Sequence, residues 1–317
     1  MQIIGIDISK SWFDVHMHAT GKKARFKNIP EGWQTFKSWA GQPFHAVMEA
    51  SGPYYISLAC WLSEQKLAVS VVNPLVIRRF SQMKFIRAKT DAKDAALIAE
   101  YAALNMPERW TPPAPFVRQL RQLLACQRQI VQMRTQVRNQ AEAFAQDYGA
   151  NDWQRQFTEE QLADLARQLE KVEARIQAIA DQHYSHTLRC LRTIPGIGPK
   201  AALLLTVLTE NFTRFDDSRQ LCGYVGLCPR IYESGSSVRG KAAICKVGHA
   251  AIRQVLYMCS WSAKKYNKAC AQMYERMAAK GKPERVIKIA LAHKLLRQAF
   301  YVGKHGVPYD EKKALAT

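Results

Sequence analysis

Apolar residues recur with two different spacings along the chain, and the spacing changes near residue 107. Before that point the apolar runs are short, as they are in β-strands. Residues 2–8 are almost wholly apolar and predict a buried strand, whereas residues 12–18 alternate as a half-buried strand does. Further strands are expected at 24–28, 44–48 and 67–72, and helices at 31–39, about 51–65, about 74–81 and about 91–104. This order predicts a mixed sheet covered by helices.

Beyond the proline-rich residues 107–115, which predict a domain boundary, the apolar period becomes helical. Residues 116–147 favour a helix, and a second long helix is expected from about 159 to 186. Its apolar residues recur at spacings of three and four, at Leu162, Leu165, Leu169, Val172, Ile176 and Ile179. This heptad seam fits either a helical hairpin within the chain or a coiled coil between two copies, and the spacing does not choose between them.

A glycine-rich turn precedes the apolar helix expected at residues 201–208. Residues 193–200 read Thr-Ile-Pro-Gly-Ile-Gly-Pro-Lys and are similar to a helix–hairpin–helix turn. Gly196 and Gly198 would let backbone amides approach a phosphate at a helix N-terminus. The alternative is a turn that only packs two helices. The expected domains are 1–108, 109–187 and 188–317.

The charge of the chain narrows the class of partner. Among 317 residues, Lys and Arg number 46 and Asp and Glu number 26, a difference of +20. Such a surplus favours a polyanionic partner through phosphate neutralisation, although it also fits a basic protein that merely stays dissolved. The longest apolar runs are too short to span a bilayer, and no signal peptide is visible. The eight cysteines form no C-x-x-C pair, which favours reduced thiols, and His183, His186 and Cys190 have a spacing more typical of structural residues than of metal ligands.

Four carboxylates lie where a mixed sheet would bring them together. Asp7 is near the end of the first strand, and Glu49 follows the fourth. Asp91 and Asp94 are three residues apart on one helix, so they share a face, although acids in a first helical turn often only favour the helix dipole. Four unpartnered carboxylates would repel one another, and a divalent cation removes that repulsion. Because Mg²⁺ prefers oxygen ligands and keeps water that a phosphate can replace, the set predicts a magnesium site.

The opening strand has a second interpretation. Ile-Gly-Ile-Asp at residues 4–7 also opens actin-like sugar kinases, but no glycine-rich nucleotide loop of that class follows. The kinase interpretation therefore ranks below the metal site.

A serine lies in the basic, glycine-flanked residues 233–240, Glu-Ser-Gly-Ser-Ser-Val-Arg-Gly. Serine is a weak nucleophile unless it is helped, and cations beside a metal-bound phosphate would help it. The residues alone do not separate Ser234 from Ser236 and Ser237. The expected nucleic-acid contacts are Lys10, Arg87, Lys89, Gly196, Gly198, Lys200, Arg230, Arg239, Lys241, Lys246 and Arg253.

These segments together resemble the DEDD transposases of the insertion-sequence one-ten family, whose relatives include the Piv invertases and bridge-RNA-guided serine recombinases. The resemblance covers nearly the whole chain. The acids lie in Gly-Ile-Asp-Ile-Ser-Lys (5–10), Glu-Ala-Ser-Gly (49–52) and Lys-Thr-Asp-Ala-Lys-Asp-Ala (89–95). The last third matches through Ile-Pro-Gly-Ile-Gly (194–198), Gly-Leu-Cys-Pro-Arg (226–230) and the serine segment.

The resemblance implies a RuvC-like, ribonuclease-H-like N-terminal domain, a central coiled coil and a mainly helical C-terminal transposase domain. It implies that Ser234 forms a phosphoserine link with DNA and that Asp7, Glu49, Asp91 and Asp94 bind Mg²⁺ and act with the serine of a partner subunit. It also implies dimers that assemble into a tetramer on donor and target DNA, an element-encoded bridge RNA that sets specificity, and a bacterial, cytoplasmic protein at the nucleoid.

Two alternatives remain beside the recombinase. A RuvC-type nuclease would need the acids and not Ser234. A basic nucleic-acid-binding scaffold would need neither.

Overall fold

The computed structural model describes residues 1–41, 43–85, 91–146, 152–230, 233–234, 238–239 and 243–315. It divides into two compact units, Met1–Pro112 and Pro113–Thr317, and the boundary between them along the chain falls in the proline-rich stretch. Arg87, Lys89 and Lys241 lie outside the described residues, as do the side chains of Asp91, Ser234 and Arg239.

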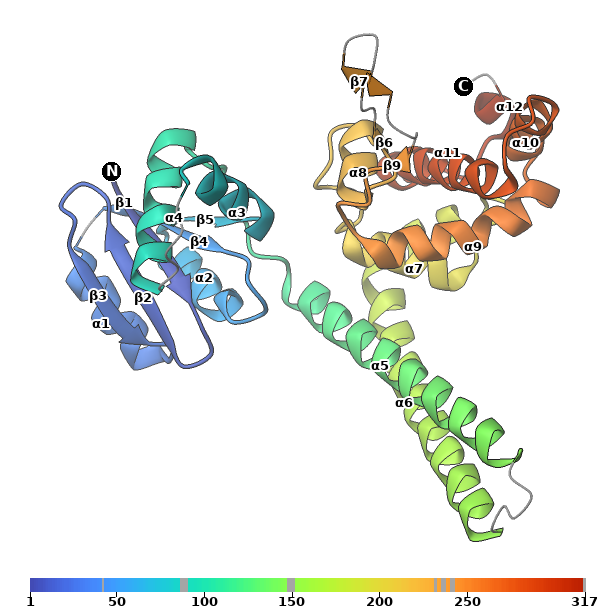
Figure 1. Cartoon of the computed structure of the whole chain (residues 1–317), viewed down its shortest axis with the longest axis horizontal. Coiled ribbons are helices and arrows are strands. Elements are labelled where there is room, and N and C mark those ends of the chain that lie inside the picture. Colours follow the sequence, from blue (N-terminus) through green and yellow to red (C-terminus); the bar gives the residue numbers. More distant parts are fainter. Residues whose placement is uncertain are drawn as a thin grey trace. The chain divides into compact units, whose positions relative to one another are not determined.

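The first unit is built on a five-stranded mixed sheet, so the expected sheet is confirmed. The strands are β1 (Gln2–Ile8), β2 (Trp12–Met17), β3 (Lys23–Lys27), β4 (Phe44–Glu49) and β5 (Ala68–Val72), in the order β3-β2-β1-β4-β5. The first three strands pair antiparallel through short turns, whereas β4 and β5 follow helical crossovers and pair parallel. Figure 1 shows helices on both faces of this sheet.

Alternate residues of each strand pack against different helices, because successive side chains point to opposite faces. On one face, Ile4 and Ile6 of β1 join the core formed with α1 (Pro30–Ala40) and α2 (Tyr55–Glu64). On the other face, Ile3 of β1 and Val47 of β4 pack with α3 (Pro74–Met83) and α4 (Asp91–Asn105).

Gly5 lets α4 lie directly on β1. A Cβ atom at this position would lie 2.2 Å from the carbonyl oxygen of Ala95 and 2.3 Å from the amide nitrogen of Ala99. Both are backbone atoms, so a side chain here could only be accommodated by moving the helix. The glycine therefore fixes the depth at which α4 packs, two residues before Asp7.

In the part of the second unit that the structure describes, helices predominate beside four two-residue strands. Two long helices, α5 (Pro115–Phe144) and α6 (Asp152–Arg192), run side by side (Figure 1). Leu165 and Leu169 of the heptad seam pack on Ile130 of α5, so in the single chain this part of the seam closes a helical hairpin. The second helix is longer than the expected 159–186, because residues beyond 186 such as Leu188 and Leu191 are buried in the unit's core.

Shorter helices complete the core of the second unit. They are α7 (Pro199–Leu208), α8 (Ser218–Val225), α9 (Ala250–Tyr266), α10 (Lys268–Ala279), α11 (Glu284–His305) and α12 (Glu311–Leu315). Buried residues of α5 to α11 form one large apolar cluster, whereas Ile130, Leu165 and Leu169 of the hairpin form a smaller one of their own. Among the described residues, no helix is long and apolar enough to cross a membrane.

Candidate active site

Asp7 and Glu49 lie at the same edge of the sheet. Glu49 ends β4 and Asp7 is the next-to-last residue of the parallel neighbour β1, and the residues just before them, Ile6 and Met48, are paired in the β1–β4 register. Each carboxylate lies on the face covered by α3 and α4, because residues two apart on a strand share a face. Asp7 lies two residues after Gly5, which contacts α4, and Glu49 lies two residues after Val47, which packs with α3 and α4. Both residues are half-buried. Open sheets bind ligands at this kind of strand end.

Asp94 approaches this edge from α4. Ile3 packs in the cluster that holds Ile98 and Ala102, and Gly5 lies against Ala95 and Ala99. The strand therefore runs toward the N-terminal turn of the helix, where Asp94 is half-buried. Asp91 begins the same helix, and its side chain lies outside the described residues.

The donors at this edge suit a hard cation, since they are all carboxylate oxygens. Among the described side chains, which exclude that of Asp91, no three His, Cys, Asp or Glu residues form a group that could hold a metal ion. The described carboxylates of Asp7, Glu49 and Asp94 therefore do not form such a group by themselves.

The structure adds a neighbour that the sequence analysis missed. Asp14 of β2 lies directly opposite Asp7 in the antiparallel register, so it shares the same face of the sheet. The guanidinium group of Arg25 donates to both carboxylate oxygens of Asp14, at 2.8–3.1 Å. This ion pair offsets a negative charge beside Asp7. The alternation of residues 12–18 placed Asp14 on a polar face, but only the strand register places it next to Asp7.

Ser234 lies in the second unit, in a short antiparallel ladder. The strands β7 (Glu233–Ser234) and β8 (Val238–Arg239) pair Ser234 with Val238. Just outside them, β6 (Pro229–Arg230) pairs with β9 (Ala243–Ile244), and the amide of Cys245 donates to the carbonyl of Cys228 at 3.0 Å. A stem of paired backbone thus carries the serine, and the five predicted catalytic residues are divided between the two units.

Several predicted nucleic-acid contacts have structural roles here. A Cβ atom on Gly196 would lie 2.8 Å from that of Ala263 in α9, so this glycine permits close helix packing. Arg253 donates from Nη1 to the carbonyl of Val225 at 2.8 Å. Lys200 is paired with Glu173 at 3.4 Å, and Gly198 is exposed with open space around it. Lys10, Arg230 and Lys246 are exposed.

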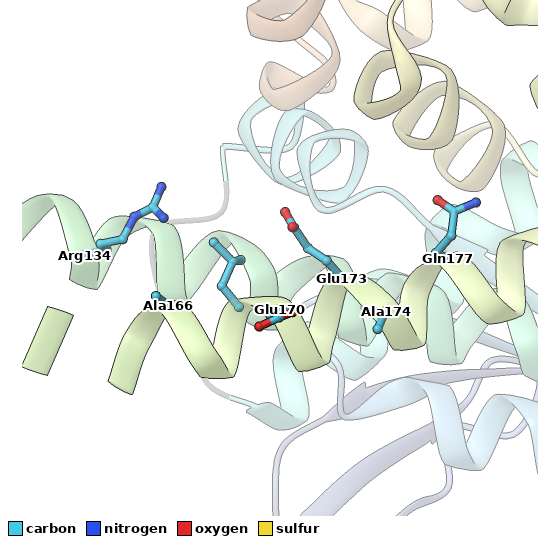
Figure 2. Close-up of a pocket in the computed structure, with 7 residues that line it drawn as sticks. Arg134, Ala166, Glu170, Glu173, Ala174 and Gln177 are labelled. Carbon is cyan, nitrogen blue, oxygen red and sulfur yellow. The ribbon is translucent and has the colours of Figure 1, made fainter. Parts of the chain in front are cut away.

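The helical hairpin also carries an open groove. It holds about 420 Å³ and is lined by Arg134 of α5 and by residues of α6 that include Glu170 and Glu173 (Figure 2). None of the predicted catalytic residues lines it.

Known protein families match both the region that holds the four acids and the region that holds Ser234. Residues 4–149 match the DEDD transposase profile of IS110, and residues 188–275 match the profile described as "Transposase IS116/IS110/IS902 family". The pilin gene-inverting protein of Moraxella bovis is 30% identical over 98% of both chains. The chain belongs to the IS110 transposase family.

Other relatives of this IS110-family transposase agree. The pilin gene-inverting protein of Moraxella lacunata is 31% identical over 98% of both chains, and the transposase for insertion sequence element IS1328 of Yersinia enterocolitica is 25% identical over 98% of both. The protein is a DNA transposase/recombinase. Its four acids fall within the first matched region, which is typical of divalent-metal use, and Ser234 falls within the second.

Proposed function

We propose that this transposase cuts and rejoins DNA through a covalent bond between Ser234 and a DNA phosphate. The observation that carries the proposal is the meeting of Asp7 and Glu49 at one sheet edge beneath the helix of Asp94, in a family member whose second matched region contains Ser234. We assign the first unit to the RuvC-like, ribonuclease-H-like class on its strand order and its acids.

The chemistry conserves the energy of the phosphodiester bond. The Ser234 hydroxyl oxygen attacks phosphorus, the P–O3′ bond breaks, and the serine proton passes through solvent to the 3′ oxygen, which leaves as a hydroxyl. A 3′-hydroxyl from another strand then reverses these steps and frees the serine, so no ATP is consumed.

Asp7, Glu49, Asp91 and Asp94 would hold Mg²⁺. When bound, the ion would neutralise charge on the phosphate under attack. The Asp14–Arg25 ion pair limits the negative charge next to Asp7, which leaves the other carboxylates as the ligands of the cation.

We further propose that the protein acts as dimers that assemble into a tetramer on donor and target DNA, with a bridge RNA that selects the sites. The net charge of +20 supports binding to nucleic acid beyond the scissile strand. Ribonuclease treatment of the purified protein, followed by a recombination assay, tests the RNA: unchanged recombination on the same sites would refute its role.

The experiment that tests the serine uses end-labelled duplex DNA, Mg²⁺ and denaturing gels. We expect a protein–DNA adduct that is lost in Ser234→Ala and kept in the matched variants Ser236→Ala and Ser237→Ala. For the acids, we expect Glu49→Gln to abolish the adduct and Glu64→Gln, on the exposed end of α2, to keep it. Free cleaved ends that survive Ser234→Ala would instead establish a RuvC-type nuclease. DNA binding that is unchanged in Glu49→Gln and Ser234→Ala, with neither adduct nor cleaved ends from the wild-type protein, would leave only the scaffold.

A further inference from the structure

Four arginines of the second unit gather around Tyr224 and His249. We call Arg121, Arg128, Arg214 and Arg253 the arginine cluster. Arg121 and Arg128 are seven residues apart on α5, so they share a face of that helix. Arg214 lies between α7 and α8, with its guanidinium carbon 5.7 Å from the centre of the Tyr224 ring. Arg253 lies in the first turn of α9 and donates a hydrogen bond to the carbonyl of Val225, the residue after Tyr224.

One acid connects these helices. Glu210 accepts from Arg121 Nη2 at 2.8 Å and from Arg214 Nη1 at 3.5 Å. The residues Glu210, Asn211 and Phe212 have φ angles of 51°, 57° and 62°, in the left-handed region that side-chain-bearing residues adopt only when their surroundings hold them there. Phe212 is fully buried and anchors this turn. The turn therefore presents Glu210 at a fixed place between two arginines.

The cluster keeps an excess of positive charge. Four guanidinium groups and the carboxylate of Glu210 leave 4 − 1 = 3 positive charges. Arg128 is exposed, and the side chain of Arg214 is 47% exposed, so two of the groups are open to a ligand. Such a charge excess held together by a strained turn is costly in the folded chain alone, and an anion would relieve it.

Two buried polar atoms in the cluster are unpaired within the described chain. His249 Nδ1 and Arg121 Nε are shielded from solvent and have no hydrogen-bond partner among the described residues. Burial lowers the pKa of His249, and the charges of Arg128, Arg121 and Arg253 lower it further. The imidazole is thus neutral at pH 7 and lies within the field of these three arginines.

The cluster adjoins the stem that carries Ser234. The amide of His249 donates to the carbonyl of Tyr224 at 3.1 Å, and the amide of Lys246 donates to that of Gly226 at 3.3 Å. These bonds join the chain just before residue 229 to the chain just after residue 244. A strand held by the arginines would therefore lie at the foot of the serine-bearing segment.

We propose that the arginine cluster binds successive phosphates of a nucleic-acid backbone and positions that strand beside the serine stem. Arg121 and Arg128 lie about 10 Å apart along α5, since a helix rises about 1.5 Å per residue. That span exceeds a single small anion and fits neighbouring phosphates of one strand. The proposal rests on the proposed function only in taking nucleic acid as the substrate, and it assigns the arginines to positioning and not to catalysis.

The test compares two variants of the same helix in the full-length protein. Arg128→Gln removes an exposed member of the cluster, and Arg138→Gln is the matched control, exposed on α5 but outside the cluster. Arg214→Gln is a second member. Fluorescence anisotropy measures binding to duplex DNA, single-stranded DNA and duplex RNA of arbitrary sequence over a range of KCl concentrations.

We expect Arg128→Gln and Arg214→Gln each to flatten the plot of log K against log salt, by about 0.9 for duplex DNA or about 0.7 for a single strand, whatever the sequence. Arg138→Gln should keep the wild-type slope. The arm whose slope changes identifies the DNA or RNA strand that the cluster holds. Wild-type slopes for both cluster variants on all three probes would overturn the proposal, as would an equal change in Arg138→Gln.

A second readout separates this proposal from the serine chemistry. Adduct formation by Arg128→Gln should fall at low DNA concentration and recover at saturating DNA, whereas Ser234→Ala should keep its salt slope and form no adduct at any concentration. A loss of adduct in Arg128→Gln that saturating DNA does not restore would refute a positioning role. Failure of the serine prediction with altered slopes in the cluster variants would leave the cluster proposal standing.

Discussion

Replacing Gly5 with alanine would test how α4 positions its acids over the sheet. The new Cβ atom would lie 2.2 Å from the Ala95 carbonyl oxygen, 2.3 Å from the Ala99 amide nitrogen and 2.8 Å from the Ala99 Cα atom. Ordinary contact begins near 3.4 Å. The helix must therefore move away by up to 3.4 − 2.2 = 1.2 Å, or tilt to the same effect.

The expected loss has a stability part and an activity part. Overpacking of this kind lowers the free energy of unfolding by about 1–3 kcal/mol. The same displacement carries Asp94, whose helix begins one turn before Ala95, away from Asp7 and Glu49. A misplacement of about 1 Å can lower a catalysed rate by roughly 10²-fold. Activity should therefore fall much more than the folded fraction does.

Both parts can be measured on the same protein. Five of the seven tryptophans lie in the first unit, at Trp12, Trp33, Trp39, Trp61 and Trp110, so urea unfolding followed by tryptophan fluorescence reports mainly on that unit. Adduct formation on labelled DNA reports activity under conditions in which the variant is folded. Gly223→Ala is the control, because a Cβ atom there meets nothing within 4 Å. Wild-type adduct formation by Gly5→Ala would refute the role of α4 depth in placing Asp94.

Three further changes probe other parts of the chain. His45 is buried, with a ring nitrogen 2.7 Å from the Ser70 hydroxyl, and its pKa is lowered below the ordinary 6.5 first by burial and then by the charge of Arg109. The unfolded chain therefore binds the proton more readily, so the first unit should lose stability as the pH falls below about 6.5. Urea titrations of His45→Gln should show a smaller loss. Gly196→Ala should destabilise the second unit by about 1–3 kcal/mol through the contact with Ala263, whereas Gly198→Ala should leave its stability unchanged. If Gly198→Ala alone lost DNA binding, that result would favour the interpretation in which this turn contacts a phosphate. Leu169→Ala should lower the free energy of unfolding by about 2–5 kcal/mol, and the control Leu104→Ala, at an exposed leucine, should lower it much less. An unchanged unfolding midpoint for Leu169→Ala would contradict the burial of the heptad seam within the chain.

The sheet could be predicted because its signals are local. Apolar runs and alternation mark β1, β2, β4 and β5, and two of the acids end such strands, so their common edge followed from strand order alone. The apposition of Asp7 and Asp14 could not be predicted, because it depends on a register that two strands establish only when they pair.

The second unit was harder to predict for two physical reasons. Its strands are two residues long, too short for any period to show, so the sequence did not predict the paired stem below Ser234. The left-handed turn at residues 210–212 contains no glycine, and tertiary packing of Phe212 holds a conformation that the local sequence does not favour. The arginine cluster depends on that turn, so its assembly could not be predicted, although Arg253 was among the expected nucleic-acid contacts.

The division of the catalytic residues between two units has a testable consequence. The acids belong to Met1–Pro112 and Ser234 to Pro113–Thr317, so under the proposed mechanism an active centre forms only where the two kinds of unit meet. If they meet between copies, a mixture of Asp7→Asn and Ser234→Ala proteins contains some centres with both an intact acid set and an intact serine. Such a mixture should form the DNA adduct on the Asp7→Asn chain, although neither variant does so alone. If they meet within one chain, no mixed centre is complete and the mixture should stay inactive. A tagged version of one variant, resolved by mass on a denaturing gel, identifies the chain that carries the DNA; an adduct on the Ser234→Ala chain would refute Ser234 as the nucleophile in either arrangement.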